Sequence, residues 1–301
     1  MTDKPFGSID ILRESSPIAA ARRARLRLAW RRYKRLTLGG LILLPFVLFA
    51  LFPYAFSAYD PLKISVKDTY EPPDARHWFG TDELGRDVFS RVVHGARISL
   101  TAALITIAFA SVVGVITGVV AGYWGGWSDR VIMGVGDMVL SFPSLVLAMA
   151  VAAALGPSLR NSMLAVAAVW WPIYTRLMRG LMLHLKQEGY VEAARAVGGN
   201  SLYIIRRHML PNSLSALNVR ISVDLGLAVQ VLASLGFIGL GVSAPTPEWG
   251  AMVSWGRTYF LTYWWIGVFP ALAIMFAVIG TSFLGDALNE LWNPYLEGSE
   301  R

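Results

Sequence analysis

Long uncharged stretches alternate with short charged ones along this chain. Crossing about 30 Å of hydrocarbon takes a helix of roughly 20 mostly apolar residues. Stretches of at least this length without Asp, Glu, Lys or Arg cover residues 37–59, 98–128, 138–159, 225–247 and 258–285. A sixth, 161–175, is shorter, but Arg176 and Arg179 can reach the headgroups from a helix that continues to about Leu183. The pattern predicts an all-α, polytopic membrane protein with six transmembrane helices.

The basic residues are unevenly distributed, and this predicts the orientation. Residues 1–40 hold ten basic and three acidic side chains, whereas residues 59–97 hold six basic and seven acidic ones. We therefore expect a cytoplasmic N-terminus, and six crossings return the C-terminus to the same side. Residues 176–211 then form a cytoplasmic loop, and their six basic against two acidic residues agree with that placement.

These boundaries divide the chain into five parts. They are a basic cytoplasmic segment 1–36, a first transmembrane helix 37–59, an extracytoplasmic loop 60–97, a core 98–287 that includes a cytoplasmic loop 186–211, and a cytoplasmic tail 288–301. The N-terminal segment is too long and too basic for an ordinary signal peptide, so we expect an uncleaved anchor. We interpret its basic stretch 22–35 as attracted to anionic lipid rather than to nucleic acid.

The composition supports this class of protein and excludes several chemistries. Of the 301 residues, 55% are apolar and 16% charged, a balance that soluble domains rarely have. Cysteine is absent, which excludes disulfides and thiolate sites. No Lys is followed by Ser or Thr, so the phosphate-binding GxxxxGK[ST] loop is missing. The four histidines form no close ligand pair and no GxSxG elbow is present. We expect no catalytic residue, bound cofactor or metal site, and hence no enzyme.

Two groups of glycines predict close helix packing. Gly114, Gly118 and Gly122 recur every four residues and form one smooth helix face on which another helix can approach closely. Residues 236–241, GFIGLG, superficially resemble a nucleotide-binding loop but lack a βαβ context. We interpret them as a close-packing element or a flexible gate.

Charged residues near the predicted spans have candidate partners on the same helix. Arg130 and Asp137 are seven residues apart on the third helix, and Arg220 and Asp224 are four apart at the start of the fifth. The alternative is a proton relay. We favour structural pairing because these acids are expected near the cytoplasmic ends of their helices rather than at mid-depth.

The loop 187–211 holds the most informative pattern. Apolar positions at i, i+3, i+4 and i+7 are Tyr190, Ala193, Ala194 and Val197. They predict a short helix with one apolar face, ended by Gly198. Asn200 or Ser201 is expected to cap a second helix, and Pro211 to begin the next span. The second helix is expected to carry on one side Leu202, Ile205 and Met209.

The apolar face of this loop has three interpretations. It packs on the protein's own helix ends, lies in the lipid interface, or docks in a groove of a partner. The small side chains Ala193 and Ala194, with Gly198, argue against lipid insertion, which favours bulky groups. Packing on the same chain and docking on a partner both stay open.

At this point the sequence resembles a known family. Residues 192–194, EAA, followed by Gly198 and residues 210–211, LP, resemble the EAA loop of the inner-membrane subunits of ABC importers. His208 stands where the general pattern has Ile, a variation that peptide permeases often carry. Further motifs resemble the C-type subunit of dipeptide and oligopeptide permeases. They are FGTDELGRD at 79–87, GARIS at 95–99, SFPS at 141–144, GFIGLG at 236–241 and PEWGAM at 247–252.

The resemblance implies a type I ABC importer permease fold in a bacterial inner membrane. The chain would form half of a path for di- or oligopeptides. The implied partners are a second permease subunit, two ATPase subunits that bind ATP and Mg, an extracytoplasmic solute-binding protein and membrane lipid, with no nucleic acid. The residues implied to couple to an ATPase are Glu188, Tyr190, Glu192, Ala193, Ala194, Val197, Gly198, His208, Leu210 and Pro211.

Several alternatives remain at this stage. Similar subunits serve nickel chelates, glutathione or sugars, and no residue is assigned to the substrate path. A secondary transporter is expected to show mid-membrane acids or an inverted repeat, and neither is evident. In the predicted outer loop, the glycines and alternating charges of residues 80–87 suit a turn braced by internal ion pairs better than a docking site for a binding protein.

Overall fold

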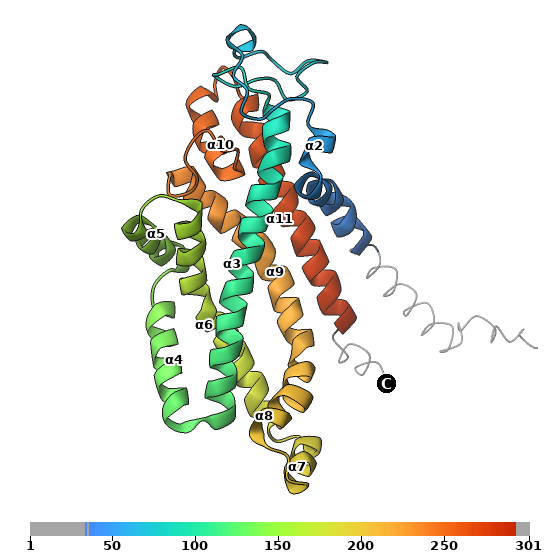
Figure 1. The fold of residues 1–301 in the computed structure, drawn as a ribbon, viewed down its shortest axis with the longest axis vertical. Coiled ribbons are helices and arrows are strands. Elements are labelled where there is room, and N and C mark those ends of the chain that lie inside the picture. The colour runs from blue at the N-terminus through green and yellow to red at the C-terminus, as the bar shows by residue number, and fades with distance from the viewer. Residues whose placement is uncertain (1–33, 35, 293–301) are drawn as a thin grey trace, which may run out of the picture.

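The protein is an elongated bundle of helices (Figure 1). The computed structural model describes Lys34 and residues 36–292, so the basic stretch 22–35, apart from Lys34, and residues 293–301 lie outside the described residues. The elements are Leu36–Leu51, α2 (Pro53–Phe56), η1 (Val66–Asp68), α3 (Val88–Trp124), α4 (Gly126–Leu140), α5 (Ser144–Leu155), α6 (Leu159–Leu185), α7 (Gly189–Ala196), α8 (Ser201–Ile204), η2 (Ile205–Met209), α9 (Leu210–Ile238), α10 (Trp249–Gly256), η3 (Arg257–Tyr259) and α11 (Trp265–Trp292). The prediction of an all-α fold is confirmed.

Among the described residues, three helices are long and apolar enough to cross a membrane. They are α3, the continuous helix Ser201–Ile238 and Trp265–Ala287. Helices α4 and α5 count as a fourth span if taken together, although they are bent by 91°. The uncharged stretch 138–159 is therefore interrupted at Pro143 rather than forming one straight helix. Pro143 precedes α5 as its N-cap and lacks the N–H that a continuing helix needs. The count of six spans stays a prediction, with Leu36–Leu51 and α6 as further candidates.

The predicted glycine face lies where α3 meets α6. A Cβ on Gly114 would lie 2.3 Å from the Cβ of Tyr174, and one on Gly118 would lie 2.6 Å from the Cβ of Met178. A Cβ on Gly122 would lie 2.6 Å from the Cβ of Met182. All three distances are well below ordinary carbon contacts of about 3.5–4.0 Å. The prediction of close packing is confirmed, because α6 approaches more closely than any side chain on this face would allow.

Ion pairs connect helices more often than the sequence suggested. Arg220 does bond Asp224 of the same helix, with Nε 2.8 Å from Oδ2, as predicted. Asp137, however, pairs with Arg176 of α6 at 2.6 Å rather than with Arg130. The carboxylate of Asp224 is also 1% exposed, well inside the helix Ser201–Ile238, so its expected place near a helix end is wrong.

A second pair joins α4 to α6. Asp129 accepts two hydrogen bonds from Arg179, at 2.5 Å from Nε and 2.7 Å from Nη2. Arg179 was expected to reach lipid headgroups, and the structure gives it a carboxylate partner instead. Such a two-point contact fixes the relative position of the helices better than a single bond does. Together with the Asp137 pair, it holds α4 along α6.

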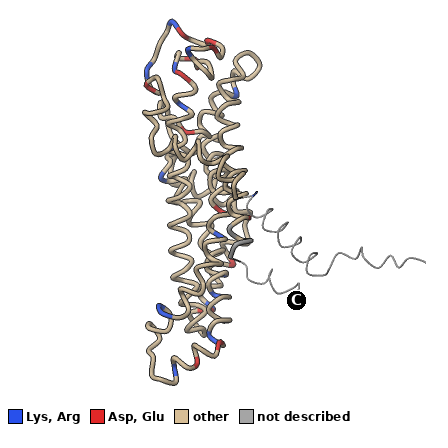
Figure 2. Tube along the Cα trace, turned by 90° about the vertical axis from the view of Figure 1, so that its right-hand side faces the viewer, with Lys and Arg blue, Asp and Glu red and all other residues tan. Residues whose placement is uncertain are grey.

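In the part of the chain that the structure describes, charged residues gather at the two ends of the bundle, with fewer between them (Figure 2). One end holds the segment between α2 and α3 together with α10, and the other holds α7 and α8 (Figure 1). The main buried cluster is built from α3, α5, α6, α9, α10 and α11. A polar–apolar–polar division along the long axis is what a bilayer-spanning protein needs.

Candidate functional site

The loop singled out by the sequence projects from one end of the bundle. It consists of α7, α8 and η2 and joins α6 to α9 (Figure 1). Lys186, at its start, donates from Nζ to the backbone oxygen of Tyr123 at 2.8 Å and so ties the loop to the end of α3. The expected short helices are therefore present, and they sit against the ends of two long helices.

Helix α7 ends in a glycine turn of the Schellman type. The N–H of Gly199 donates to the oxygen of Ala194 and that of Gly198 to the oxygen of Arg195, both at 2.9 Å. Gly198 has φ +86°, which side chains other than glycine rarely adopt, and a Cβ there would meet nothing of this chain within 4 Å. The space over Gly198 is thus open to another molecule.

The second half of the loop continues directly into a long helix. Asn200 caps α8 by accepting from the N–H of Tyr203 at 2.8 Å. The chain then passes through the π-helical turn η2 into α9, so residues from Ser201 to Ile238 form one helix. Pro211 lies in the first turn of α9 as expected, but it does not begin a separate helix. The loop and the span are one element.

One face of the loop packs on the protein itself. Val191 and Ala194 of α7 are buried together with Ile204, Ile205 and Met209. They contact side chains near the ends of α3 and α6, which are Tyr123, Met178 and Met182. Packing on the same chain therefore accounts for Ala194 but not for the whole predicted face. Val191 was missed, because an eight-residue helix has too few positions to define its buried side.

The other face of the loop is apolar and exposed. Val197 is 86% exposed, Leu202 61%, Tyr203 52% and Tyr190 40%. Ala193, Gly198 and Pro211 are also exposed, whereas Leu210 is half-buried. Beside them lies a shallow pocket of about 470 Å³ whose lining residues are Asn200, Leu202, Tyr203, Arg206 and Arg207. An exposed apolar surface with arginines at its edge is typical of a protein-docking surface.

The remaining predicted residues flank this surface. Glu192 is exposed in the first turn of α7, where the helix dipole favours a carboxylate. Glu188 lies with Oε1 3.4 Å from Nε2 of His184 in an exposed contact. His208 is half-buried, and its ring centroid lies 5.5 Å from that of Tyr203. The loop thus brings the predicted coupling residues together around one exposed surface, although Ala194 points into the protein.

At the opposite end, the motif at 79–87 is braced internally. Asp82 accepts from Nε of Arg86 at 2.6 Å, and Arg86 also donates to Glu83 at 3.0 Å. Asp87 caps α3 by accepting from the N–H of Ser90 at 2.7 Å. Asp82, Arg86 and Asp87 are each at most 4% exposed. The expectation of a turn held by ion pairs is confirmed for these residues, which are too buried to meet a partner.

The GFIGLG and PEWGAM motifs meet in space. Glu248 caps α10, accepting from the N–H groups of Gly250 and Ala251 at 2.9 and 2.8 Å, and is 3% exposed. A Cβ on Gly236 would lie 2.6 Å from Oε2 of Glu248, and one on Gly241 would lie 2.7 Å from the Cα of Gly236. Burial raises the pKa of Glu248. Between the two readings of GFIGLG, the structure favours close packing around this carboxylate.

Comparisons with known proteins identify the family. Residues 114–297 match the family model described as a binding-protein-dependent transport system inner membrane component. A probable D,D-dipeptide transport system permease protein of Escherichia coli K12 is 45% identical over 87% of this chain and 88% of its own length. A dipeptide transport system permease protein of Alkalihalophilus pseudofirmus is 39% identical over 89% of this chain and 88% of its own.

Two further similarities concern cargo and fold. A glutathione transport system permease protein of Pectobacterium atrosepticum is 39% identical over 89% of this chain and 90% of its own length. An inward-facing structure of the MetNI methionine ABC transporter superposes with a TM-score of 0.56 at 19% identity, covering 68% of this chain and 97% of that one. The fold is thus the type I ABC importer permease fold that the motifs implied. The chain belongs to the binding-protein-dependent transport system inner membrane components and is a permease subunit of an ABC importer.

Proposed function

We propose that short peptides cross the membrane along a path that this chain forms with a second permease subunit, and that the α7–α8 surface seats on an ATPase subunit that powers the movement. The exposed face of the loop carries this proposal. Tyr190, Val197 and Leu202 expose apolar area at a polar end of the molecule, where water makes such exposure unfavourable unless a partner covers it.

The opposite face of the same loop explains how a partner would move the bundle. Val191 and Met209 are fully buried against the ends of α3 and α6. The loop is also continuous with α9. A rigid contact of this kind lets a motion of the ATPase change the relative stability of inward-open and outward-open arrangements. ATP and Mg then act in the partner subunits, and this chain contributes no catalytic group.

The proposed orientation places the loop 186–211 and both termini in the cytoplasm. Charge supports it, since six basic and two acidic residues lie between residues 176 and 211, and ten basic residues lie in 1–40. The segment 60–97 then faces a solute-binding protein outside the membrane. In this proposed orientation, the basic segment 1–36 and the tail 288–301 lie in the cytoplasm. A cysteine placed at Val197, with this cysteine-free chain as background, should be labelled only from the cytoplasmic side.

The docking role is tested with matched glycines. Gly198 and Gly239 both have positive φ, +86° and +94°, both end helices, and a Cβ on either meets nothing within 4 Å. Asn is among the side chains that tolerate this conformation best, so both replacements carry a similar backbone cost. In vesicles containing the complete transporter, Gly198→Asn and Gly198→Asp should abolish ATP-driven uptake, whereas Gly239→Asn should retain it.

Uptake is read together with ATPase binding, so that misfolding is not mistaken for lost docking. We expect Gly198→Asp to insert and to unfold at a temperature close to that of the wild type, but to lose the ATPase subunit on purification. Normal uptake by Gly198→Asp contradicts the docking role. Uptake by the wild-type permease without its ATPase contradicts ATP-driven import and supports a secondary transporter.

The cargo is proposed from the relatives, whose names refer to D,D-dipeptide, dipeptide and glutathione transport. All three are short peptides. Mass spectrometry of the ligand that co-purifies with the partner binding protein, followed by competition against labelled dipeptide uptake, distinguishes among them. A nickel chelate or a sugar as that ligand contradicts the peptide proposal while leaving the ATPase-docking proposal intact.

A further inference from the structure

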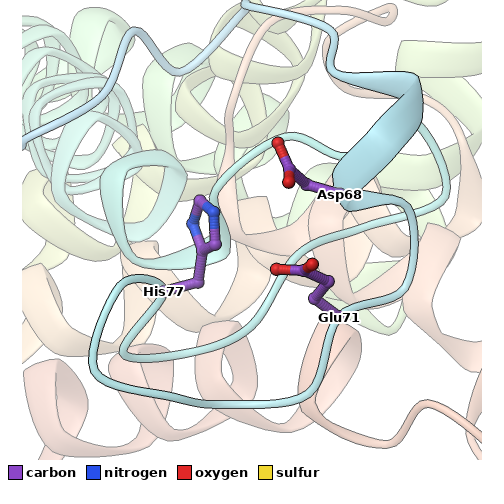
Figure 3. Close-up of side chains that lie close together, drawn as sticks. All are labelled: Asp68, Glu71 and His77. Carbon is purple, nitrogen blue, oxygen red and sulfur yellow. The ribbon is translucent and has the colours of Figure 1, made fainter.

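Three potential metal ligands meet in the segment that joins α2 to α3, at the end of the molecule opposite the docking loop. One donor atom each from Asp68, Glu71 and His77 lies within 4.8 Å of the other two. Figure 3 shows both carboxylates turned toward the imidazole ring. We propose that these three residues bind a divalent transition-metal ion of the zinc class. The ligands are Nε2 of His77 and one oxygen of each carboxylate.

His77 is held as a ligating histidine would be. Its side chain is buried, and Nδ1 lies 2.9 Å from Oδ1 of Asp87. A carboxylate that accepts from one ring nitrogen fixes the tautomer, so the other nitrogen of a neutral imidazole presents its lone pair. Asp87 is itself fixed, because it caps α3. Within the described residues Nε2 has no hydrogen bond, and it faces the two carboxylates.

The carboxylates each keep one oxygen for a metal. Ser65 donates to Oδ2 of Asp68, and Arg76 donates to Oε2 of Glu71 at 3.0 Å. In the part of the chain that the structure describes, Oδ1 of Asp68 and Oε1 of Glu71 have no hydrogen-bond donor. Two neighbouring carboxylates repel each other, and Arg76, which is 62% exposed, offsets this only weakly. A divalent cation would neutralise both charges.

The three donor atoms must move slightly closer together to bind the ion. Ligand bonds of about 2.0–2.1 Å place the donor atoms of one tetrahedral zinc about 3.3 Å apart. The present separations of up to 4.8 Å therefore close by roughly 1.5 Å or less. Glu71 is 28% exposed and can rotate by this amount. Two carboxylates and one imidazole are a ligand set that zinc and manganese accept, and water completes the shell.

The ion would hold residues 68–71 against His77, whose ring is bonded to Asp87, the N-cap of α3. Sequence spacing alone did not reveal this, because the ligands follow no helical repeat and meet only through the fold of the segment. The proposal concerns ion binding to this segment and does not depend on the identity of the cargo or on ATPase docking.

The test uses the intact chain in detergent. EDTA first removes bound metal, the chain is then dialysed against zinc, and the zinc that remains bound is measured. We expect about one tightly bound zinc per chain, a higher unfolding temperature with zinc than without it, and an X-ray absorption spectrum with nitrogen and oxygen ligands and no sulfur. Glu71→Gln and Asp68→Asn should each weaken zinc binding at least tenfold.

Two variants serve as controls. Glu83→Gln removes a nearby carboxylate outside the cluster, which pairs with Arg86 instead, and should leave zinc binding unchanged. Arg76→Gln removes the cation that competes for Glu71 and should keep or tighten binding. Zinc content no higher than in a blank dialysis, or equal binding by Glu71→Gln and the wild type, overturns the proposal.

Discussion

The contact between α3 and α6 gives a quantitative test of the packing argument through Gly118→Ala. The added Cβ would lie 2.6 Å from both the Cβ of Met178 and the backbone oxygen of Thr175. Ordinary contacts are about 3.5–4.0 Å, so the two helices must separate by roughly 1 Å. Overpacking of this kind costs about 1–3 kcal/mol. The separation also strains the 2.7 Å hydrogen bond between Thr117 and Thr175, which adds about 0.6 kcal/mol.

The matched control lies on the partner helix. A Cβ on Gly180 of α6 meets nothing within 4 Å. Gly180→Ala therefore reports only the gain in helix propensity, up to about 1 kcal/mol. Thermal unfolding in one detergent should place Gly118→Ala below the wild type, at roughly 2–4 °C per kcal/mol, and Gly180→Ala at or above it. Equal stability of the two alanine variants would refute the argument, because the predicted clash is what distinguishes them.

Three further outcomes follow from the ion pairs and caps. Asp129→Arg and Arg179→Asp should each lower the unfolding temperature, and the double variant, which exchanges the charges of this α4–α6 pair, should restore it. A double variant that unfolds at a temperature no higher than the single variants contradicts the contact. Asp87→Ala removes the cap of α3 and the partner of the buried His77 ring, so it should lower the free energy of unfolding by more than the roughly 1–2 kcal/mol of a cap alone, measured by thermal unfolding. Because burial raises the pKa of Glu248, the folded state binds that proton more tightly, and stability should fall as pH rises from about 4 through the raised value. Glu248→Gln should flatten this slope, and an unchanged slope would contradict the assignment.

The sequence predicted the long helices and their closest contact well. Uncharged length and the four-residue glycine repeat are local properties, and both appear in α3. Proline is expected to interrupt a span, and it does so at Pro143, whereas α6 continues through Pro172. Only the packing around each position decides which proline interrupts a span.

The docking loop was predicted as two short helices separated at Gly198. The break at Gly198 agrees, but the second helix continues through η2 into α9 instead of ending before Pro211. Which face turns inward was not predictable from eight residues, since it depends on where the ends of α3 and α6 lie. Ala194 turns inward and Val197 outward for that reason. The close approach of Glu248 to Gly236 could not be predicted from the sequence either, because the two motifs are separate in sequence and meet only in the folded chain.

The continuity of α8, η2 and α9 has a mechanical consequence. A helix of 38 residues is about 57 Å long, so it can act as a rigid lever. The exposed side chains Leu202 and Tyr203 lie at its N-terminal end. A tilt of about 5° at that end would displace the far tip, next to Glu248, by about 5 Å. The π-helical turn η2 lies in this helix between the exposed Leu202 and Tyr203 and the start of α9. Under the proposed docking, a small rotation of the ATPase subunit would therefore displace the far end of this helix by about the width of a peptide backbone.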